Sequence, residues 1–279
     1  MSAVAAPTPV PEGRRPRLRP TTRARLIRGA LYVVFAAVIA AIAFVADWQA
    51  IRTNYFDAQV WKSLFPEIIT TAAKNTVIYT LYSFVLAFAL AIIVALMKLA
   101  PVAPYRWLAT AYIEFFRGLP ALVVIFGVGL TLPLAFNGWR PPGGNGGAGV
   151  MALTIVYGAY MAETIRAGIQ AVPKGQYEAA RSLGMSSYRT MRSITMPQAL
   201  RIVIPPLTNE FVALLKDTSL IQVLGFAATE RELTSFASDN IVAYANASPL
   251  MAVAVLYLVI TLPLTRLVAW LERRGQRGR

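Results

Sequence analysis

Six polar residues inside otherwise apolar stretches of this chain are its strongest candidates for chemistry. Charged groups within membrane hydrocarbon are costly, so they usually line a cavity or pair with one another. The residues predicted to line a path that holds a charged or zwitterionic solute are Glu163, Asn209, Glu210 and Arg117. For Glu163 and Asn209, a role in the path and a structural role are equally supported. The adjacent Lys216 and Asp217 favour structural pairing, because internal pairing is the default for such charges.

The residue types exclude several other kinds of site. The 279 residues include no Cys and no His, which excludes disulfides, thiol chemistry, a Cys/His zinc site and a His-based triad. No pair of carboxylates at catalytic spacing stands out, and we predict neither a catalytic residue nor a metal site. The glycine-rich stretch at 143–147, GGNGG, lacks the GK[ST] of a phosphate-binding loop and is predicted to be a flexible loop.

The elements that position these residues are membrane-spanning helices. The chain is 57% hydrophobic and 14% charged, whereas a soluble domain is about 25% charged. Its apolar runs are continuous, which favours helices over a β-barrel. We therefore predict an all-α polytopic protein with six spans, at about 29–46, 70–97, 107–136, 150–170, 203–225 and 249–270. The third span should break near Pro120, because proline lacks a backbone N–H.

The distribution of basic residues predicts the orientation. The net charge is +14, and Lys and Arg cluster in segments that flank apolar runs. With six spans, twenty basic residues fall on the side that holds both termini and four on the other side. This positive-inside pattern places both termini in the cytoplasm. The same pattern accounts for the basic composition, because Lys and Arg concentrate beside the cytoplasmic face of the lipid bilayer. Nucleic-acid binding is therefore not needed to explain the positive charge.

Composition divides the chain into four parts. Residues 1–28 are predicted to form a disordered basic cytoplasmic tail. Residues 29–69 hold an extra N-terminal span and an extracellular segment. Residues 70–270 form the core, which includes a polar cytoplasmic loop at 173–201, and residues 271–279 form a second basic tail.

The sequence of the cytoplasmic loop predicts two short helices. The sequence GQYEAARSLGM at 175–185 predicts a helix that ends with Gly184 as its C-cap. Ala179, Ala180 and Leu183 should share a face of it. Ser186 or Ser187 should cap a second helix, and Pro197 should mark the turn back to the membrane. From these residues alone, a docking surface and a helix pair lying on lipid headgroups are equally supported.

The spacing of residues in this loop resembles the EAA loop of ABC-transporter permeases. The matching positions are Glu178, Ala179, Ala180, Gly184, Ile194 and Pro197, and only the Leu position differs, where Met196 stands. The segments FRGLP at 116–120, YMAETIRAGIQAVPKGQYEAARSLG at 160–184, PQALRIVIPPLTNEF at 197–211 and LLKDTSLIQVLG at 214–225 resemble the polar amino acid branch of this family. The resemblance covers about 70–270.

The resemblance implies a type I ABC importer permease with a five-helix core and one added N-terminal helix. The loop residues Glu178, Ala179, Ala180, Leu183, Gly184, Ile194 and Pro197 would couple it to a separate ATPase dimer. ATP and Mg²⁺ would bind that ATPase, and this chain would carry no cofactor. The other implied partners are a second, identical or homologous permease, an extracellular solute-binding protein and a polar amino acid. The richness in Ala, Arg and Pro suggests a bacterial cytoplasmic membrane.

The sequence leaves two alternatives to a transport subunit. A membrane-embedded enzyme would use the intramembrane charges for catalysis, and a passive channel or scaffold would work without an ATPase. The absence of Cys and His counts against an enzyme, and the EAA spacing counts against both. The sequence does not distinguish among amino acids or between a homomeric and a heteromeric permease pair.

Overall fold

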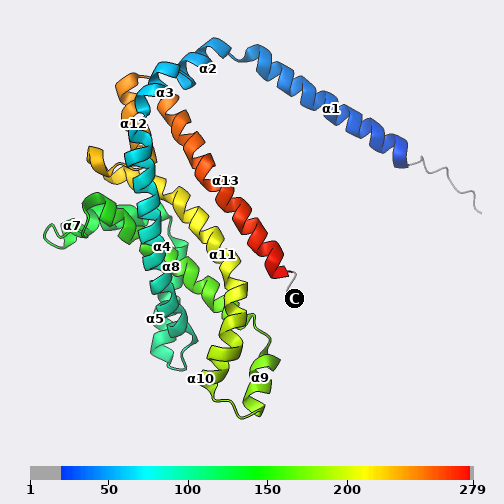
Figure 1. The fold of residues 1–279 in the computed structure, drawn as a ribbon, viewed down its shortest axis with the longest axis vertical. Coiled ribbons are helices and arrows are strands. Elements are labelled where there is room, and N and C mark those ends of the chain that lie inside the picture. Colours follow the sequence, from blue (N-terminus) through cyan, green and yellow to red (C-terminus); the bar gives the residue numbers. More distant parts are fainter. Residues whose placement is uncertain (1–19, 277–279) are drawn as a thin grey trace, which may run out of the picture. The chain divides into compact units, whose positions relative to one another are not determined.

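The computed structural model describes residues 20–276, which are helical almost throughout (Figure 1). No β-strand occurs within this range, and the predicted all-α class is confirmed. The chain forms two compact units, the first ending at Ile51 and the second beginning at Arg52. The predicted tail at 1–28 lies largely outside the described residues, and its described part, from Pro20 on, is helical.

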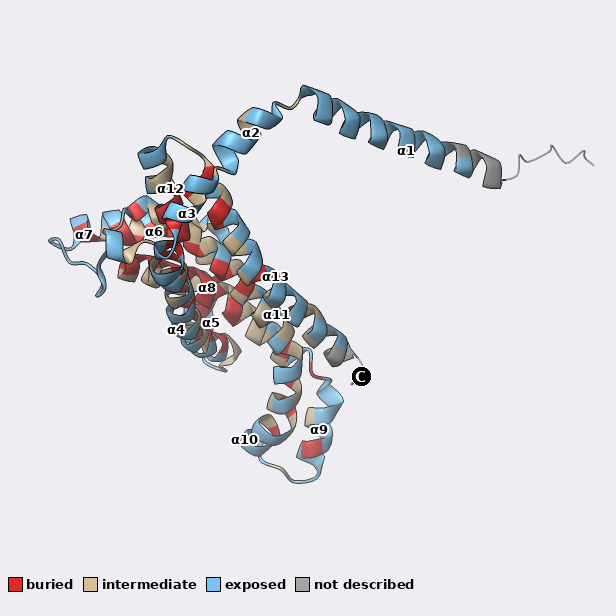
Figure 2. Ribbon diagram, turned by 45° about the horizontal axis from the view of Figure 1, so that its top comes forward, coloured by how far each residue is buried: buried red, intermediate tan, exposed pale blue. Residues whose placement is uncertain are grey.

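The first unit is dominated by α1 (Pro20–Val45). Its apolar window, Ile27–Val45, buries none of its residues, and Figure 2 shows this helix as exposed along its described length. The indole Nε1 of Trp48 donates to the Ala43 carbonyl (2.8 Å), and the Asp47 carboxylate accepts from the Ala50 N–H (2.8 Å). These two bonds fix the start of α2 (Trp48–Tyr55).

The centre of the second unit is the pair α4 (Lys74–Leu99) and α8 (Gly144–Gln170), which form its most extensive helix contact. Small residues on the buried face of α4 make the close approach possible. They are Thr76, Thr80, Ser83, Ala87, Ala91 and Ala95. Buried residues gather around α8 (Figure 2). The helix α3 (Ala58–Leu64) and the π-helical η1 (Ile68–Ala73) precede α4.

The glycine-rich stretch that was predicted to be a flexible loop is instead the first turn of α8. A side chain on Gly146 would come within 2.7 Å of the Tyr79 hydroxyl, and one on Gly147 within 1.8 Å of the Pro142 carbonyl. Glycine is therefore needed for close packing at this helix start. The glycines predicted a loop because glycine is common in turns, but here tertiary contacts require the same residues in a helix.

The predicted break at Pro120 is confirmed. The helix α5 (Ala103–Gly118) and the following segment, Ala121–Ala135, meet at an angle of 106°. The second segment consists of α6 (Ala121–Phe126), η2 (Gly127–Thr131) and α7 (Leu132–Ala135). The carbonyl of Pro120 accepts from the N–H groups of Val123 and Val124, which starts the new helix.

The rest of the unit begins with α9 (Lys174–Ser182), α10 (Ser187–Thr190) and η3 (Met191–Thr195). The helix α11 (Met196–Asp217) follows and passes into the 3-10 helix η4 (Thr218–Leu224). A short η5 (Ala228–Glu230) leads to α12 (Leu233–Tyr244) and α13 (Ser248–Gln276). A second apolar cluster joins Leu64, Ile68, Phe236 and Val253.

Four helices in the described residues are long and apolar enough to span a membrane. They are Ile27–Val45, Ile68–Leu99, Gly144–Gln170 and Ser248–Leu271, and the bent pair of α5 and α6–α7 would make a fifth. The predicted span at 203–225 corresponds to α11 and η4, and α11 is not among these four. The count of six spans therefore stays a prediction.

Candidate functional site

The loop that connects α8 to α11 is a helical hairpin with a well-defined corner. The helix α9 ends in a Schellman motif, in which the Met185 N–H donates to the Ala180 carbonyl (3.2 Å) and the Gly184 N–H to the Arg181 carbonyl (3.0 Å). Gly184 has φ +82°, a left-handed conformation that glycine adopts without strain. The predicted helix end at Gly184 is therefore confirmed.

The second helix of the hairpin starts at Ser186, whose hydroxyl accepts from the Arg189 N–H (3.3 Å). Of the two predicted caps, Ser186 is thus the one used. The predicted turn at Pro197 is wrong, because helical backbone continues from α10 through η3 into α11. The missing N–H of Pro197 is accommodated next to the wide π-helical turns of η3.

The outer face of the hairpin is partly apolar. Leu183 is 85% exposed and Tyr188 is 74% exposed. Ala179 is also exposed and lies one turn before Leu183, whereas Ala180 is buried. The predicted shared face is thus divided: Ala180 packs into the hairpin, and Ala179 and Leu183 point outward. Glu178 is exposed as well, Ile194 is partly buried, and Pro197 is exposed.

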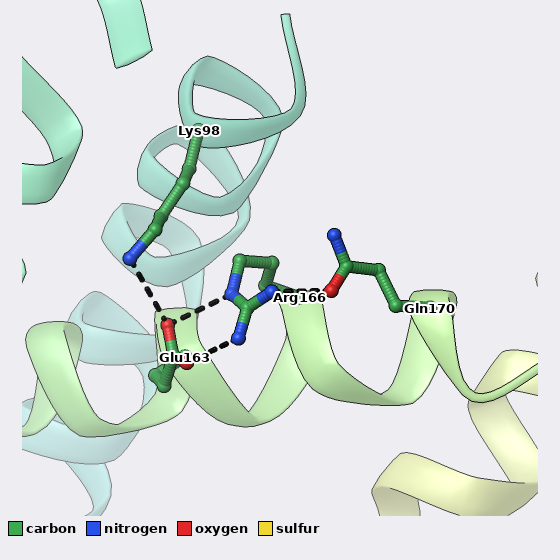
Figure 3. A network of polar contacts seen from close by, with 4 residues as sticks. All are labelled: Lys98, Glu163, Arg166 and Gln170. Atoms are coloured by element: carbon green, nitrogen blue, oxygen red, sulfur yellow. Dashed lines mark hydrogen bonds and ion pairs between the residues drawn. The ribbon is translucent and has the colours of Figure 1, made fainter. Parts of the chain in front are cut away.

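An ion-pair network joins the end of α4 to the last turns of α8, just before the hairpin (Figure 3). Glu163 Oε2 accepts from the Lys98 ammonium at the end of α4 (3.4 Å) and from Arg166 Nε (2.9 Å), and Oε1 accepts a second bond from Arg166. Arg166 also donates to the side chain of Gln170, the last residue of α8. Each of the three charged side chains is about one-fifth exposed. The network therefore fixes the end of α8 just before α9 begins.

Close packing adds to this attachment. A side chain on Gly168 would lie 2.0 Å from Val203 of α11, so α8 and α11 approach each other through a glycine. The two helices that flank the hairpin are thus in direct contact at its base.

A second group of polar side chains lies where α5, α8 and α11 meet. The Arg117 guanidinium sits over the Tyr160 ring, 5.5 Å from its centre, and the Tyr160 hydroxyl donates to the Arg117 carbonyl (3.5 Å). The Tyr157 hydroxyl donates to Asp217 Oδ2 (2.9 Å). Arg117 and Asp217 both act electrostatically on Glu210.

The four predicted path residues are therefore not brought together. Arg117 and Glu210 share one cluster, Glu163 belongs to the ion-pair network, and Asn209 is exposed on α11. Lys216 is exposed, and its charge acts on the neighbouring Asp217. Within residues 20–276, no group of three or more Asp or Glu residues is arranged to hold a metal ion.

Sequence reasoning missed Lys98, Arg166 and Tyr160. The spacing of Glu163 and Arg166, three residues apart on one predicted helix, is a signal that would have found their pair. Lys98 lies 65 residues from Glu163 in sequence. Only the packing of α4 on α8 reveals that contact.

Comparison with known proteins gives a consistent result. The family described as "Binding-protein-dependent transport system inner membrane component" matches residues 87–277. The probable glutamine ABC transporter permease protein GlnM of Bacillus subtilis is 40% identical over 204 residues, which are 73% of this chain and 91% of that protein. The arginine transport system permease protein ArgU of Corynebacterium glutamicum is 36% identical over 258 residues, 88% of this chain and 80% of that protein.

Solved structures of ABC transporters have a similar fold. A crystal structure of an amino acid ABC transporter with histidines has a TM-score of 0.70 and 37% identity, covering 78% of this chain and 98% of that chain. An inward-facing structure of the MetNI methionine ABC transporter has a TM-score of 0.63 at 16% identity, covering 77% and 98%. The second match concerns the fold alone.

Proposed function

The chain belongs to the family of binding-protein-dependent transport system inner membrane components, and from that premise we propose that it imports polar amino acids, driven by ATP hydrolysis on a separate subunit. It has the predicted type I ABC importer permease fold. It is a transport subunit of the cytoplasmic membrane and not an enzyme, which sets aside the membrane-enzyme alternative. Importers of this kind work with an ATPase and a solute-binding protein.

The names of the relatives support the substrate class. GlnM is named for glutamine and ArgU for arginine, and a further relative, the L-cystine transport system permease protein TcyB of Bacillus subtilis, 37% identical over 182 residues, is named for L-cystine. These solutes share an α-ammonium and an α-carboxylate and differ in their side chains. We infer that this chain accepts the shared zwitterion and leaves selection of the side chain to the binding protein.

The hairpin of α9 and α10 is the proposed contact with the ATPase, and its geometry is the observation that carries the proposal. An exposed leucine on a short, capped helix gives a partner an apolar anchor in a fixed position. The ion-pair network and Gly168 fix the helices on either side of this hairpin, since they join α8 to α4 and to α11. A movement of the hairpin would therefore be transmitted to the intramembrane helices. ATP and Mg²⁺ would bind the partner.

The polar cluster of Arg117, Tyr160 and Glu210 is the part of the path proposed to meet the solute. A guanidinium suits the α-carboxylate, and a carboxylate suits the α-ammonium. In this proposal Asn209, one residue before Glu210, contributes a neutral polar contact. Glu163 contributes to coupling through its ion pairs, and Lys216 with Asp217 stabilises the helix end.

The proposed orientation places the hairpin and both termini in the cytoplasm, as the distribution of basic residues predicts. A second permease, identical or homologous, would complete the path. Large exposed apolar side chains on α5 support this, since Tyr105, Trp107 and Leu108 are 54–71% exposed and available to lipid or to a partner helix.

The test is purification of the tagged chain from its host in mild detergent, followed by reconstitution into proteoliposomes. We expect a separate ATPase to copurify, and we expect added binding protein with glutamine, arginine or cystine to stimulate ATP hydrolysis and uptake of the same labelled amino acid. A chain that purifies alone even after mild crosslinking would contradict the proposal. Uptake without ATP would favour a passive channel instead.

A further inference from the structure

The segment from Thr218 to Glu232, between α11 and α12, contains only two short 3-10 helices. Such a segment cannot pair its own carbonyl groups as an α-helix does, and unpaired carbonyls in apolar surroundings are costly. Ile221 and Leu224 are nevertheless almost fully buried. Side chains from other helices must therefore supply the missing donors.

Three side chains on α4 and α8 supply them. Asn145 Nδ2 donates to the carbonyls of Leu224 (2.8 Å) and Gly225 (2.7 Å). Asn75 Nδ2 donates to the carbonyls of Thr229 (2.9 Å) and Arg231 (3.0 Å), and the Tyr79 hydroxyl donates to the Glu230 carbonyl (2.9 Å). Each asparagine thus uses both N–H groups, which fixes the orientation of its amide.

Apolar side chains of the same segment fit against glycines. A side chain on Gly129 would lie 2.3 Å from Leu224, and one on Gly149 would lie 2.6 Å from Ile221. The Tyr79 ring stacks on Phe226 with 6.2 Å between ring centres. The segment is thus held against α4 and α8 by shape and by neutral hydrogen bonds.

The position of this attachment matters for transport. Lys74 begins α4 and Gly144 begins α8, while the ion-pair network and the hairpin lie at the other ends of these helices. About 26 residues of helix, roughly 39 Å, separate the two ends. The segment also follows directly after Asp217, so it lies next to the proposed path on the side opposite the hairpin.

We propose that Asn75, Tyr79 and Asn145 are positioning residues that hold 218–232 closed over the outer end of the path, and that these bonds release in the outward-open state. This inference rests on the proposed import function. It assigns to the three residues an energetic role: they favour the closed state, and the loaded binding protein and ATP must overcome that preference.

The chain has no native cysteine, so a single introduced thiol reports on opening without interference. We would place it at Leu224, which is 8% exposed, and use Thr229→Cys as an exposed reference. Labelling by a water-soluble maleimide would be compared in the full-length chain with and without Tyr79→Phe or Asn145→Ala. The matched controls are Tyr112→Phe, which removes a hydroxyl bond to the Ile155 carbonyl, and Asn246→Ala, which removes an amide bond to the Thr53 carbonyl.

We expect Leu224→Cys to label about threefold faster with Tyr79→Phe and about tenfold faster with Asn145→Ala, since one or two hydrogen bonds are lost. The two controls should leave its rate unchanged. Equal rates in all backgrounds, or equal acceleration by the controls, would overturn the proposal. This measurement needs no ATPase and no solute, so its failure is distinct from failure of the import function.

The second readout is ATP hydrolysis by the reconstituted complex without binding protein. Tyr79→Phe and Asn145→Ala should raise this basal rate several-fold, because less stabilisation of the closed state remains to be overcome. A merely structural role would lower basal and stimulated rates together. A fall in both rates, measured beside a wild-type complex that responds normally to binding protein, would also overturn the proposal.

Discussion

The two ends of the α4–α8 pair are held by different kinds of contact. At the hairpin end, Lys98, Glu163 and Arg166 form ion pairs, whereas at the other end Asn75 and Asn145 donate neutral hydrogen bonds to a neighbouring segment. Removing one member of a partly buried ion pair leaves an uncompensated charge and costs a few kcal/mol. A neutral hydrogen bond contributes about 1 kcal/mol net.

This difference in energetic cost matches the difference between the two proposed tasks. A hairpin that transmits force from an ATPase must stay attached to the helices it moves, and charges make its attachment expensive to break. A segment that closes the path must detach in every cycle, and several weak neutral bonds allow that. The comparison predicts that changes at the hairpin end abolish coupling, while changes at the other end bias opening.

The largest effect is expected from Gly184→Val in the hairpin. Its φ of +82° is unfavourable for a β-branched residue by roughly 1–2 kcal/mol, so the corner between α9 and α10 must change shape. Solute-stimulated ATP hydrolysis and uptake should fall at least about tenfold, with the chain still inserted in the membrane. The matched control is Gly175→Ala in α9, where an added Cβ meets nothing within 4 Å; normal transport by Gly184→Val would contradict the role of the hairpin.

The second effect, on stability rather than on transport, is expected from Glu163→Ala. Lys98 and Arg166 would keep their charges without the carboxylate that accepts from both, and we expect a loss of about 2–4 kcal/mol in stability. The midpoint of thermal unfolding of the detergent-solubilised chain measures this. Adding Lys98→Ala should restore part of the loss, because it removes one uncompensated charge. Strictly additive effects of the two substitutions would show that the ion pair contributes nothing.

Lys98 and Gly184 also illustrate how far sequence reasoning reached. The end of α9 at Gly184 and the bend at Pro120 follow from local rules, because glycine adopts the left-handed conformation of a helix end without strain and proline lacks the backbone N–H that a continuing helix needs. The contact of Lys98 with Glu163 depends on which helices pack together. Rules for neighbouring residues in the sequence do not predict that packing. The same holds for the start of α8, where glycines that are typical of a loop serve close packing.

Residues 218–225 were predicted as the last part of a membrane span at 203–225, because most of them are apolar. Apolar character indicates burial, but it does not distinguish an α-helix from a segment whose carbonyls are paired by Asn75 and Asn145. The sequence named Arg117 and Glu210 as candidates for the path, and that role stays a prediction. Their grouping, with Arg117 near Glu210 and Glu163 apart from both, needed the structure.

A smaller effect is expected from pH at the outer segment. Glu232 is fully buried at the start of α12, accepts from the N–H groups of Thr234 and Ser235 (2.6 Å each), and faces Tyr257 and Tyr79. Burial raises its pKa above the usual 4.5, although these hydrogen bonds lower it in part. Because the folded chain then binds the proton more tightly than the unfolded chain, this group stabilises folding most below pH 4.5, and that contribution is lost as pH rises through the raised pKa.

The measurement is the thermal midpoint between pH 4.5 and 7 for the wild type and for Glu232→Gln. One unit of pKa is worth about 1.4 kcal/mol, so the wild type should lose stability over this range relative to Glu232→Gln. Asp239→Asn serves as a control, since that exposed carboxylate pairs with Arg231 (2.8 Å) and should not reproduce the difference. Parallel pH profiles of the wild type and Glu232→Gln would contradict the assignment.

The smallest expected effect is that of salt on the two ends. The screening length falls from about 10 Å at 0.1 M to about 3 Å at 1 M, which weakens the partly exposed ion pairs but not the neutral bonds. Hydrogen exchange should therefore become modestly faster at 163–170 and stay unchanged at 222–229. An equal change of the exchange rate in both regions would contradict the difference between an ionic and a neutral end.

The central claim is that the α9–α10 hairpin is the contact with an ATPase. A photocrosslinking amino acid in place of Leu183, which is 85% exposed, tests it directly in the native host. The account predicts a crosslinked product that contains an ATPase subunit with a nucleotide-binding signature, and no such product from the same probe placed at Phe44 on α1. Products with lipid alone, from a complex that still contains the ATPase, would contradict it.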